Sequence, residues 1–297
     1  MPKRMATTIS ESFRATRSSG TSCRLSQTEA RDEYILKGAM LFVTWPEEAF
    51  RPTGDLDLLG HGDADPGTIT ELFTRICRVE MPADAILFEP STLKVEAVRE
   101  EEKYKGVRLT LRGHLGRVII PVKVDIGFDY RVYPAPSARA SSSLLPDLPA
   151  ADVLMHPPET VLAGKFEAML RFGEANGRAR DFHDIWVITR TFPFDLSTLV
   201  EAIAGTLQRR ETAVPTGMPV ALTPQFAERA DRQALWTGFL RRNPPTLPPP
   251  PFDEILTELR RFLPRGNSRL SHCRRAQAVV GALTAGTGNK CDRVRAG

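Results

Sequence analysis

Two aspartates two residues apart, Asp55 and Asp57, have the spacing in this sequence best suited to chemistry. They lie in the stretch Arg51-Pro52-Thr53-Gly54-Asp55-Leu56-Asp57-Leu58-Leu59-Gly60, whose leucines predict a β-strand anchored in a core. Residues i and i+2 of a strand project from the same face, so both carboxylates would point the same way. Like charges held together repel unless a cation lies between them, and Mg²⁺ takes carboxylate oxygens as ligands. The pattern predicts a metal site, and the alternative is a solvated loop or helix cap.

A third acid, Asp125, lies near the end of an apolar strand predicted over residues 118–126. Three alternating residues of that strand would share one face, namely Ile120, Val122 and Val124. If the strand lies beside residues 55–58, Asp125 joins the aspartate pair on the opposite face. The alternative is an exposed acid on an edge strand, paired with Lys123 or Arg117.

Other residues have the chemistry to bind phosphates. Lys37-Gly38-Ala39 follows a short apolar run and predicts a tight turn that opens a helix, whose free backbone N–H groups suit phosphate. A simple packing turn is the alternative. Arg51 and Thr53 directly precede the aspartate pair.

A second charged group occurs in the later part of the chain. Lys165 lies mid-helix among apolar neighbours, where it either extends to water or reaches a triphosphate. Arg178, Asp181 and Asp184 follow at intervals of three residues and share one face of a predicted helix. The alternative for these three is ion pairing within the helix, worth about 0.2–0.5 kcal/mol a pair.

The predicted strands and helices that would position these residues indicate an α+β fold, with most strands in the first half of the chain and most helices in the second. Strands are predicted near residues 34–36, 51–59, 86–88, 93–98, 104–112 and 118–126. Helices are predicted near residues 68–78, 158–172, 178–191, 195–209, 222–241 and 253–263. Prolines and serines over residues 135–156 indicate a linker between two domains, 25–134 and 157–264.

Charge is distributed unevenly along the 297 residues, whose net charge is +4. Residues 1–24 carry five Lys or Arg and one acid, residues 265–297 carry seven and one, and the middle therefore carries about −6. Both ends have little periodicity and are expected to be disordered basic tails. Basic tails of this kind can also bind nucleic acid through its phosphates.

The cellular compartment of the protein is predicted from its cysteines and its apolar segments. The four cysteines are scattered without a Cys-x-x-Cys pair, which favours a reducing, cytoplasmic setting over a disulfide scaffold or zinc site. No apolar run approaches 18 residues and no secretory signal is recognisable, so no membrane partner is expected.

Taken in order, these segments resemble the AbiEii/AbiGii-type nucleotidyltransferase toxins of the polymerase-β-like superfamily. The resemblance spans about residues 24–263 and depends on five strings: Leu36-Lys37-Gly38-Ala39-Met40-Leu41; Arg51 to Gly60; Val124-Asp125-Ile126-Gly127-Phe128; Glu159 with Lys165-Phe166-Glu167-Ala168-Met169; and Arg178-Ala179-Arg180-Asp181-Phe182-His183-Asp184-Ile185-Trp186. It implies a nucleotidyltransferase-type mixed sheet with flanking helices, followed by a mostly helical C-terminal domain. It also implies Mg²⁺-dependent transfer of a nucleoside monophosphate from an NTP, as the toxin of a phage-defence toxin–antitoxin system. RNA, and tRNA in particular, is the implied acceptor, and the antitoxin encoded nearby would act mainly without a stable complex.

The resemblance also implies roles for individual residues. Asp55, Asp57 and Asp125 would be catalytic and would bind the metal, and Asp125 would accept the proton of the attacking hydroxyl. Eight residues would contact the nucleotide: Lys37, Gly38, Ala39, Arg51, Thr53, Lys165, Arg178 and Asp181. Ala39 departs from the Gly, Ser or Thr of many relatives, and the first 24 residues do not reproduce the helices with which relatives begin. A catalytically degenerate binding scaffold and nucleotidyl transfer to a small molecule are the alternative functions.

Overall fold

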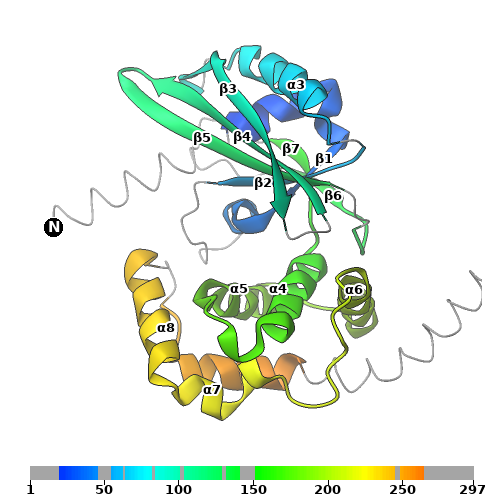
Figure 1. The fold of residues 1–297 in the computed structure, drawn as a ribbon, viewed down its shortest axis with the longest axis vertical. Helices are drawn as coiled ribbons and strands as arrows, with labels where there is room; N and C mark the ends of the chain where they lie inside the picture. Colours follow the sequence, from blue (N-terminus) through cyan, green and yellow to red (C-terminus); the bar gives the residue numbers. More distant parts are fainter. Residues whose placement is uncertain are drawn as a thin grey trace, which may run out of the picture. The chain divides into compact units, whose positions relative to one another are not determined.

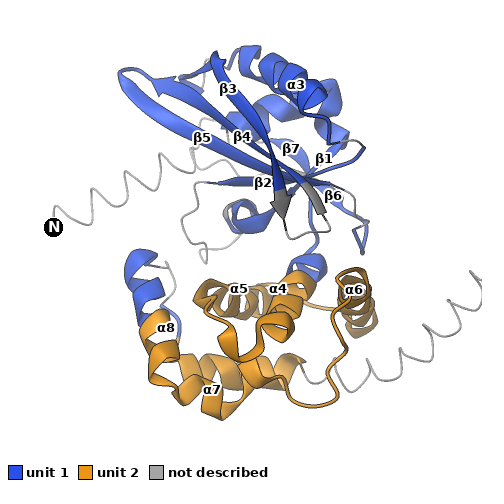
Figure 2. Cartoon of the chain, in the orientation of Figure 1, with its two compact units in different colours: residues 1–161, 237–249 blue, residues 162–236, 250–297 orange. Residues whose placement is uncertain are grey.

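The computed structural model describes residues 20–45, 55–62, 64–81, 84–100, 104–128, 132–140, 151–244 and 248–263. The chain forms two compact units (Figure 1 and Figure 2). Unit 1 comprises residues 1–161 and 237–249, and unit 2 comprises residues 162–236 and 250–297. Strands lie in unit 1 and helices dominate unit 2, so the predicted α+β class is confirmed.

The described strands of unit 1 form one seven-stranded mixed sheet in the order β3-β4-β5-β2-β1-β7-β6. Its strands are β1 (Tyr34–Lys37), β2 (Leu56–Gly60), β3 (Ile86–Glu100), β4 (Tyr104–Leu115), β5 (Val118–Phe128), β6 (Ser137–Ala140) and β7 (Asp152–Met155). β2 runs parallel to β5 and β1 runs parallel to β7, whereas the other neighbours are antiparallel. The predicted β4–β5 hairpin is confirmed. The strands expected over 86–88 and 93–98 are one strand, β3, whose pairing with β4 shifts register between Glu89 and Lys94.

Helix α3 (Pro66–Arg78) packs on the sheet and buries its apolar stripe (Figure 1). Asp65 caps its first turn by accepting a hydrogen bond from the Thr68 backbone N–H at 2.7 Å. The ring of Phe73 meets Tyr34 of β1 edge to face at a centroid distance of 6.4 Å. Four residues at helical spacing form the buried stripe: Ile69, Leu72, Phe73 and Ile76. This is the helix that the spacing predicted from residue 68.

Two segments that composition assigned to the N-terminal tail and the linker belong to the folded unit. Residues 20–26 are helical, and Arg24 is buried, where its Nη1 and Nη2 donate to the Asp84 carboxylate. Strands β6 and β7 lie within the expected linker, residues 135–156. They were missed because each is only four residues long, and backbone pairing with neighbouring strands determines a short strand more than its composition does. Residues 1–19 and 264–297, which include most of both expected tails, lie outside the described residues.

Helices build unit 2 and the segments that join it to unit 1. They are α4 (Pro158–Phe172), α5 (Ala179–Thr191), α6 (Leu196–Arg209), α7 (Pro224–Glu228), α8 (Ala230–Arg242) and a helical stretch over residues 252–263. The division between the units falls within α4 and within α8. The single helix predicted over 222–241 is α7 and α8, since Arg229 between them has an extended ψ of 129°. Among the described helices, none is long and apolar enough to span a membrane.

Candidate active site

A row of charged residues crosses one face of the sheet in unit 1, because strand register places them side by side. Lys37 of β1 lies opposite Asp57 of β2, and Asp57 lies opposite Asp125 of β5. Asp125 in turn lies opposite Arg108 of β4. Cross-strand partners project from the same face, so these four side chains form one line. The predicted meeting of Asp57 and Asp125 on neighbouring strands is confirmed.

The opposite face of the same strands is apolar and holds the row in place. Leu56 and Leu58 of β2 and Val124 and Ile126 of β5 are almost fully buried, whereas Asp57 and Asp125 are half-buried. This alternation is the one that the leucines around the aspartate pair predicted. A slip of one residue in register would expose the leucines and bury the acids, so the core fixes the position of the carboxylates.

The Gly38 turn lies directly against Asp57. Gly38 has φ +70°, a left-handed conformation that a glycine adopts at little cost. A Cβ at this position would lie 2.1 Å from Asp57 Oδ2, so no other residue fits beside the carboxylate without displacing it. Ala39 follows in a short 3₁₀ turn (Gly38–Met40) that leads into α2 (Leu41–Thr44). The predicted sequence of strand, tight turn and helix is confirmed, although α2 is only four residues long.

Asp125 is held by two cations from its own sheet. Arg108 donates through Nε and Nη2 to Oδ1 and Oδ2, at 2.7 and 3.1 Å, and Lys123 Nζ lies 3.1 Å from Oδ2. Burial raises the pKa of Asp125, but the hydrogen bonds and charges of Arg108 and Lys123 outweigh it and hold that pKa below its ordinary value of 3.8. β5 lies between β4 and β2, so the alternative of an edge-strand acid is wrong. Lys123 was foreseen as a partner, whereas Arg108 was not.

The side chains of Lys123 and Lys37 extend over the face of the sheet that carries the aspartates. Lys123 Nζ also lies 3.9 Å from Oδ2 of Asp55, whose side chain is exposed just before β2. Lys37 extends across the sheet, since a Cβ on Gly127 would lie 2.9 Å from its Nζ. Lys123 therefore bridges Asp55 and Asp125, while the Lys37 ammonium reaches Gly127, which is two residues after Asp125 on β5. The other two residues predicted near this site, Arg51 and Thr53, lie outside the described residues.

The carboxylates are close neighbours but are not gathered as metal ligands. Among the described residues, no group of three His, Cys, Asp or Glu side chains is arranged to hold a metal ion. In this arrangement the positive charge beside Asp55 and Asp125 comes from Lys123 and Arg108.

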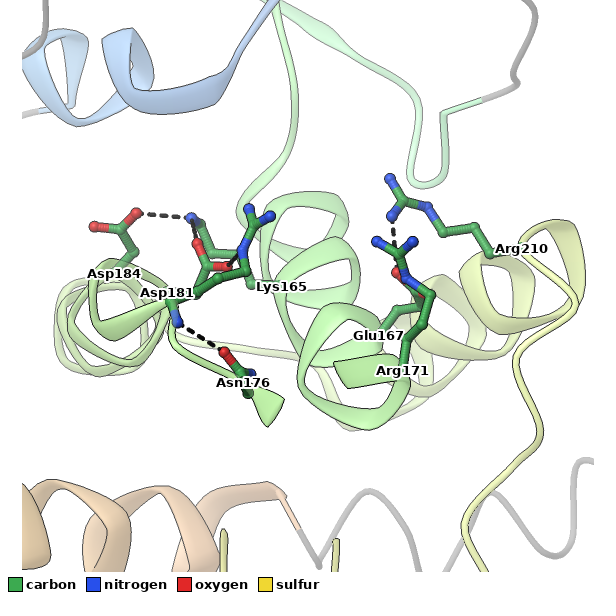
Figure 3. A network of polar contacts seen from close by, with 8 residues as sticks. Lys165, Glu167, Arg171, Asn176, Asp181, Asp184 and Arg210 are labelled. Carbon is green, nitrogen blue, oxygen red and sulfur yellow. Dashed lines mark hydrogen bonds and ion pairs between the residues drawn. The ribbon is translucent and has the colours of Figure 1, made fainter. Parts of the chain in front are cut away.

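A second cluster lies in unit 2, where Lys165 joins two helices (Figure 3). Its Nζ lies 2.9 Å from Oδ1 of Asp181 and 2.7 Å from Oδ2 of Asp184. Lys165 is on α4 and both aspartates are on α5, and the aspartate side chains are 1% and 0% exposed. The alternative of ion pairing within the helix is confirmed for Arg178 and Asp181, but it does not include the pairs that both aspartates make with Lys165 on the neighbouring helix. Lys165 does not simply extend to water either.

Arg178 completes this cluster at the start of α5. Its Nε donates to Asp181 Oδ2 at 2.5 Å, and its backbone N–H donates to the side chain of Asn176 at 2.9 Å. Burial raises the pKa of Asp181, but the charges of Lys165 and Arg178 outweigh it and hold that pKa below 3.8. The Arg178 side chain stays 41% exposed, so the buried aspartate orients a cation that solvent can still reach.

A neighbouring network on the same helix has a structural role (Figure 3). Glu167 of α4 is fully buried and accepts hydrogen bonds from Arg210 at 2.8 Å and from the Thr212 hydroxyl at 2.8 Å. Arg171, one turn along α4, lies 3.3 Å from the same carboxylate. These contacts satisfy the buried charge and hold α4 to the end of α6.

Comparisons with known proteins relate the chain to a family model and to two solved structures. A family model described as the nucleotidyl transferase AbiEii toxin of type IV toxin–antitoxin systems matches residues 22–258. The crystal structure of JHP933 from Helicobacter pylori is 12% identical, with a TM-score of 0.45, and the match covers 88% of this chain and 94% of that one. The crystal structure of a proposed nucleotidyltransferase from H. pylori is 14% identical, with a TM-score of 0.44, and the match covers 85% and 92% of the two chains. No curated protein matches the sequence.

Proposed function

The chain belongs to the AbiEii family of nucleotidyl transferase toxins, and on that premise we propose that it transfers a nucleoside monophosphate from an NTP to RNA, with tRNA as the expected acceptor, in a Mg²⁺-dependent reaction. Membership of a type IV toxin–antitoxin family implies an antitoxin as its partner. Cytoplasmic action in phage defence, with an antitoxin that forms no stable complex, is part of the same proposal. The observation that carries it is the placement of Asp57 opposite Asp125 with Asp55 beside them.

The residues of the sheet offer the donor chemistry of a divalent metal ion, although their side chains are not gathered around one point. Lys123 Nζ approaches Oδ2 of both Asp55 and Asp125, so two carboxylates already converge on one cation. Asp57 lies opposite Asp125 and supplies a third hard oxygen donor, which is the ligand chemistry that Mg²⁺ takes. When bound, Mg²⁺ would supply charge stabilisation at the phosphates. Asp55, Asp57 and Asp125 would hold it.

Asp125 is better suited to holding positive charge than to accepting a proton. With Arg108 and Lys123 lowering its pKa, it is ionised at neutral pH, as a metal ligand must be. The same lowered pKa makes it a weaker base than a free carboxylate. We therefore favour the ligand role for Asp125 over the proton-accepting role that the resemblance also implied.

The phosphate contacts are proposed for groups in each unit taken separately. In unit 1, the Gly38 turn lies beside Asp57 and the Lys37 side chain extends toward Gly127, and the turn with Ala39 and this ammonium are suited to a triphosphate. In unit 2, Lys165 and Arg178 are suited to phosphate oxygens, and the buried Asp181 would orient them without touching the nucleotide. Arg51 and Thr53 remain proposed nucleotide contacts on the sequence alone.

Release of pyrophosphate tests this proposal for any acceptor. The wild-type protein, incubated with each NTP and Mg²⁺, is expected to release pyrophosphate faster when total RNA is added. Asp57→Asn should lower that rate at least about a hundredfold, because catalysis of phosphoryl transfer depends on positioning and charge. Asp152→Asn is the matched control, since Asp152 is an exposed acid on β7 of the same sheet. An equal rate in wild type and Asp57→Asn contradicts the proposal.

A further inference from the structure

Lys123 contacts two of the three aspartates. It lies on β5, two residues before Asp125, and its side chain is 34% exposed. Its Nζ is 3.1 Å from Asp125 Oδ2 and 3.9 Å from Asp55 Oδ2. In the parallel register of β2 and β5, position 55 lies next to position 123, which explains how one ammonium reaches both acids.

Asp125 does not need Lys123 for a charge partner. Arg108 already engages both of its carboxylate oxygens in a bidentate pair, the strongest arrangement for this kind of contact. Lys123 adds a second, compact charge on a flexible stem and shares it with the exposed Asp55. An ammonium in this position neutralises like charges that would otherwise repel, as a metal ion would.

We propose that Lys123 acts as an internal counter-cation, which occupies the position between Asp55 and Asp125 in the metal-free protein and must leave that position when a divalent ion binds. This inference rests on the proposed function, because it concerns the same carboxylates. Lys123 is then a positioning residue. It holds Asp55 and Asp125 close together through its contacts with both, and it sets the metal affinity by competing for Oδ2 of each acid.

Lysine's competition for these oxygens has a direct consequence for metal affinity. A divalent ion needs carboxylate oxygens as ligands, and two of the oxygens in question already face an ammonium. Removing the ammonium leaves Asp55 and Asp125 with less compensating charge, so the metal-free state becomes less favourable and metal binding stronger. Arg108 continues to hold Asp125 after that change, so the carboxylate keeps its place on the sheet.

Binding of Mn²⁺ to the full-length protein, measured by calorimetry without nucleotide, tests the inference. Lys123→Gln is expected to bind Mn²⁺ about tenfold more tightly than wild type, which corresponds to about 1.4 kcal/mol. Lys123→Arg retains the positive charge and should bind within about twofold of wild type. Lys123→Met serves as a second neutral variant, and circular dichroism checks that each protein is folded.

Lys94→Gln is the matched control. Lys94 is an exposed lysine on β3 in the same row of the sheet, and Thr110 of β4 separates it from Lys123. Its removal should leave the Mn²⁺ affinity unchanged. The inference is overturned if folded Lys123→Gln and Lys123→Met bind Mn²⁺ no more tightly than Lys94→Gln while Asp57→Asn weakens binding. If instead wild type and Asp57→Asn bind Mn²⁺ equally or not at all, the proposed metal site itself fails.

Discussion

At the scale of single residues, the site depends on how closely backbone and carboxylate approach one another. Gly38 has a left-handed backbone and no side chain, and both features are needed beside Asp57. The Gly38 turn is therefore part of what fixes the orientation of the Asp57 carboxylate. The same residue was proposed from the sequence to bind a triphosphate, and its contact with Asp57 would place the phosphates next to the acids.

Gly38→Ala tests this contact. The new Cβ would overlap Asp57 Oδ2, and the left-handed backbone alone costs roughly 1–2 kcal/mol for an L-residue. We expect the free energy of unfolding, measured in urea, to fall by more than that amount and transferase activity to be lost. Gly62→Ala is the matched control, because Gly62 has φ +95° but open space around it. Equal losses of stability and activity in the two variants would show that the contact with Asp57 does not matter.

Residue type and spacing were sufficient to find the aspartates but not all their partners. Asp55 and Asp57 could be placed on one face because strand alternation has a fixed period of two, whereas Asp125 joined them only if its strand lay beside residues 55–58. Arg108 could not be found this way, because its meeting with Asp125 depends on the register of a hairpin whose arms are 17 residues apart at that point. Asp184 was seen as one of three charges on a helix face, and its burial against Lys165 depends on packing between α4 and α5.

At the scale of elements, α4 and α5 are held together by a buried ion cluster. Lys165 on α4 pairs with Asp181 and Asp184 on α5, and the aspartates are almost completely removed from water. Buried charges are costly unless every one is paired, so each member depends on the others. The cluster therefore fixes the position of α5, and with it the exposed guanidinium of Arg178.

The pH dependence of stability tests the cluster. The folded-state pKa of Asp181 lies below 3.8, so its carboxylate stabilises the fold at higher pH, and this contribution is lost as the pH falls through that lowered pKa. We expect Asp181→Asn to lower the free energy of unfolding by about 2 kcal/mol at pH 7. The difference from wild type should shrink as the pH is lowered below 4.

Urea unfolding between pH 7 and about pH 2 measures that difference, because this range extends below the ordinary pKa of an aspartate. Asp253→Asn, at an exposed acid in unit 2, is the control and should match wild type at each pH. A deficit in Asp181→Asn that stays constant or grows as the pH falls would mean that the Asp181 carboxylate is not stabilised by Lys165 and Arg178.

Long elements were predicted well and short or interrupted ones were not. Helix α3 and the β4–β5 hairpin have strong apolar periodicity, which is the most reliable signal in a sequence. Strands β6 and β7 are only four residues each. β6 is positioned by its pairing with β7, and β7 by its pairing with β1. The break between α7 and α8 is a local extended conformation at Arg229, and no glycine or proline marks it.

At the scale of the whole molecule, the chain combines a sheet unit that holds the acids with a helical unit that holds a cluster of paired charges. Asp55, Asp57 and Asp125 belong to the sheet unit, and Lys165 and Arg178 belong to the helical unit. The α+β class and the order of the segments were predictable because each half has its own periodicity. The division of the chain into units was not predictable in the same way. Residues 237–249 belong to unit 1, although the sequence around them is helical and was assigned to the second domain.

Transfer of label from an NTP to RNA tests the central claim most directly. The purified protein, each α-³²P-labelled NTP, Mg²⁺ and total RNA would be incubated beside Asp57→Asn and the exposed-acid control Asp152→Asn. The account predicts label in an RNA band for wild type and Asp152→Asn, with at least about a hundredfold less for Asp57→Asn. Label in a small molecule instead of RNA would contradict the proposed acceptor. Absence of transfer to any acceptor, together with absence of NTP binding, would contradict the enzymatic account and favour a binding scaffold.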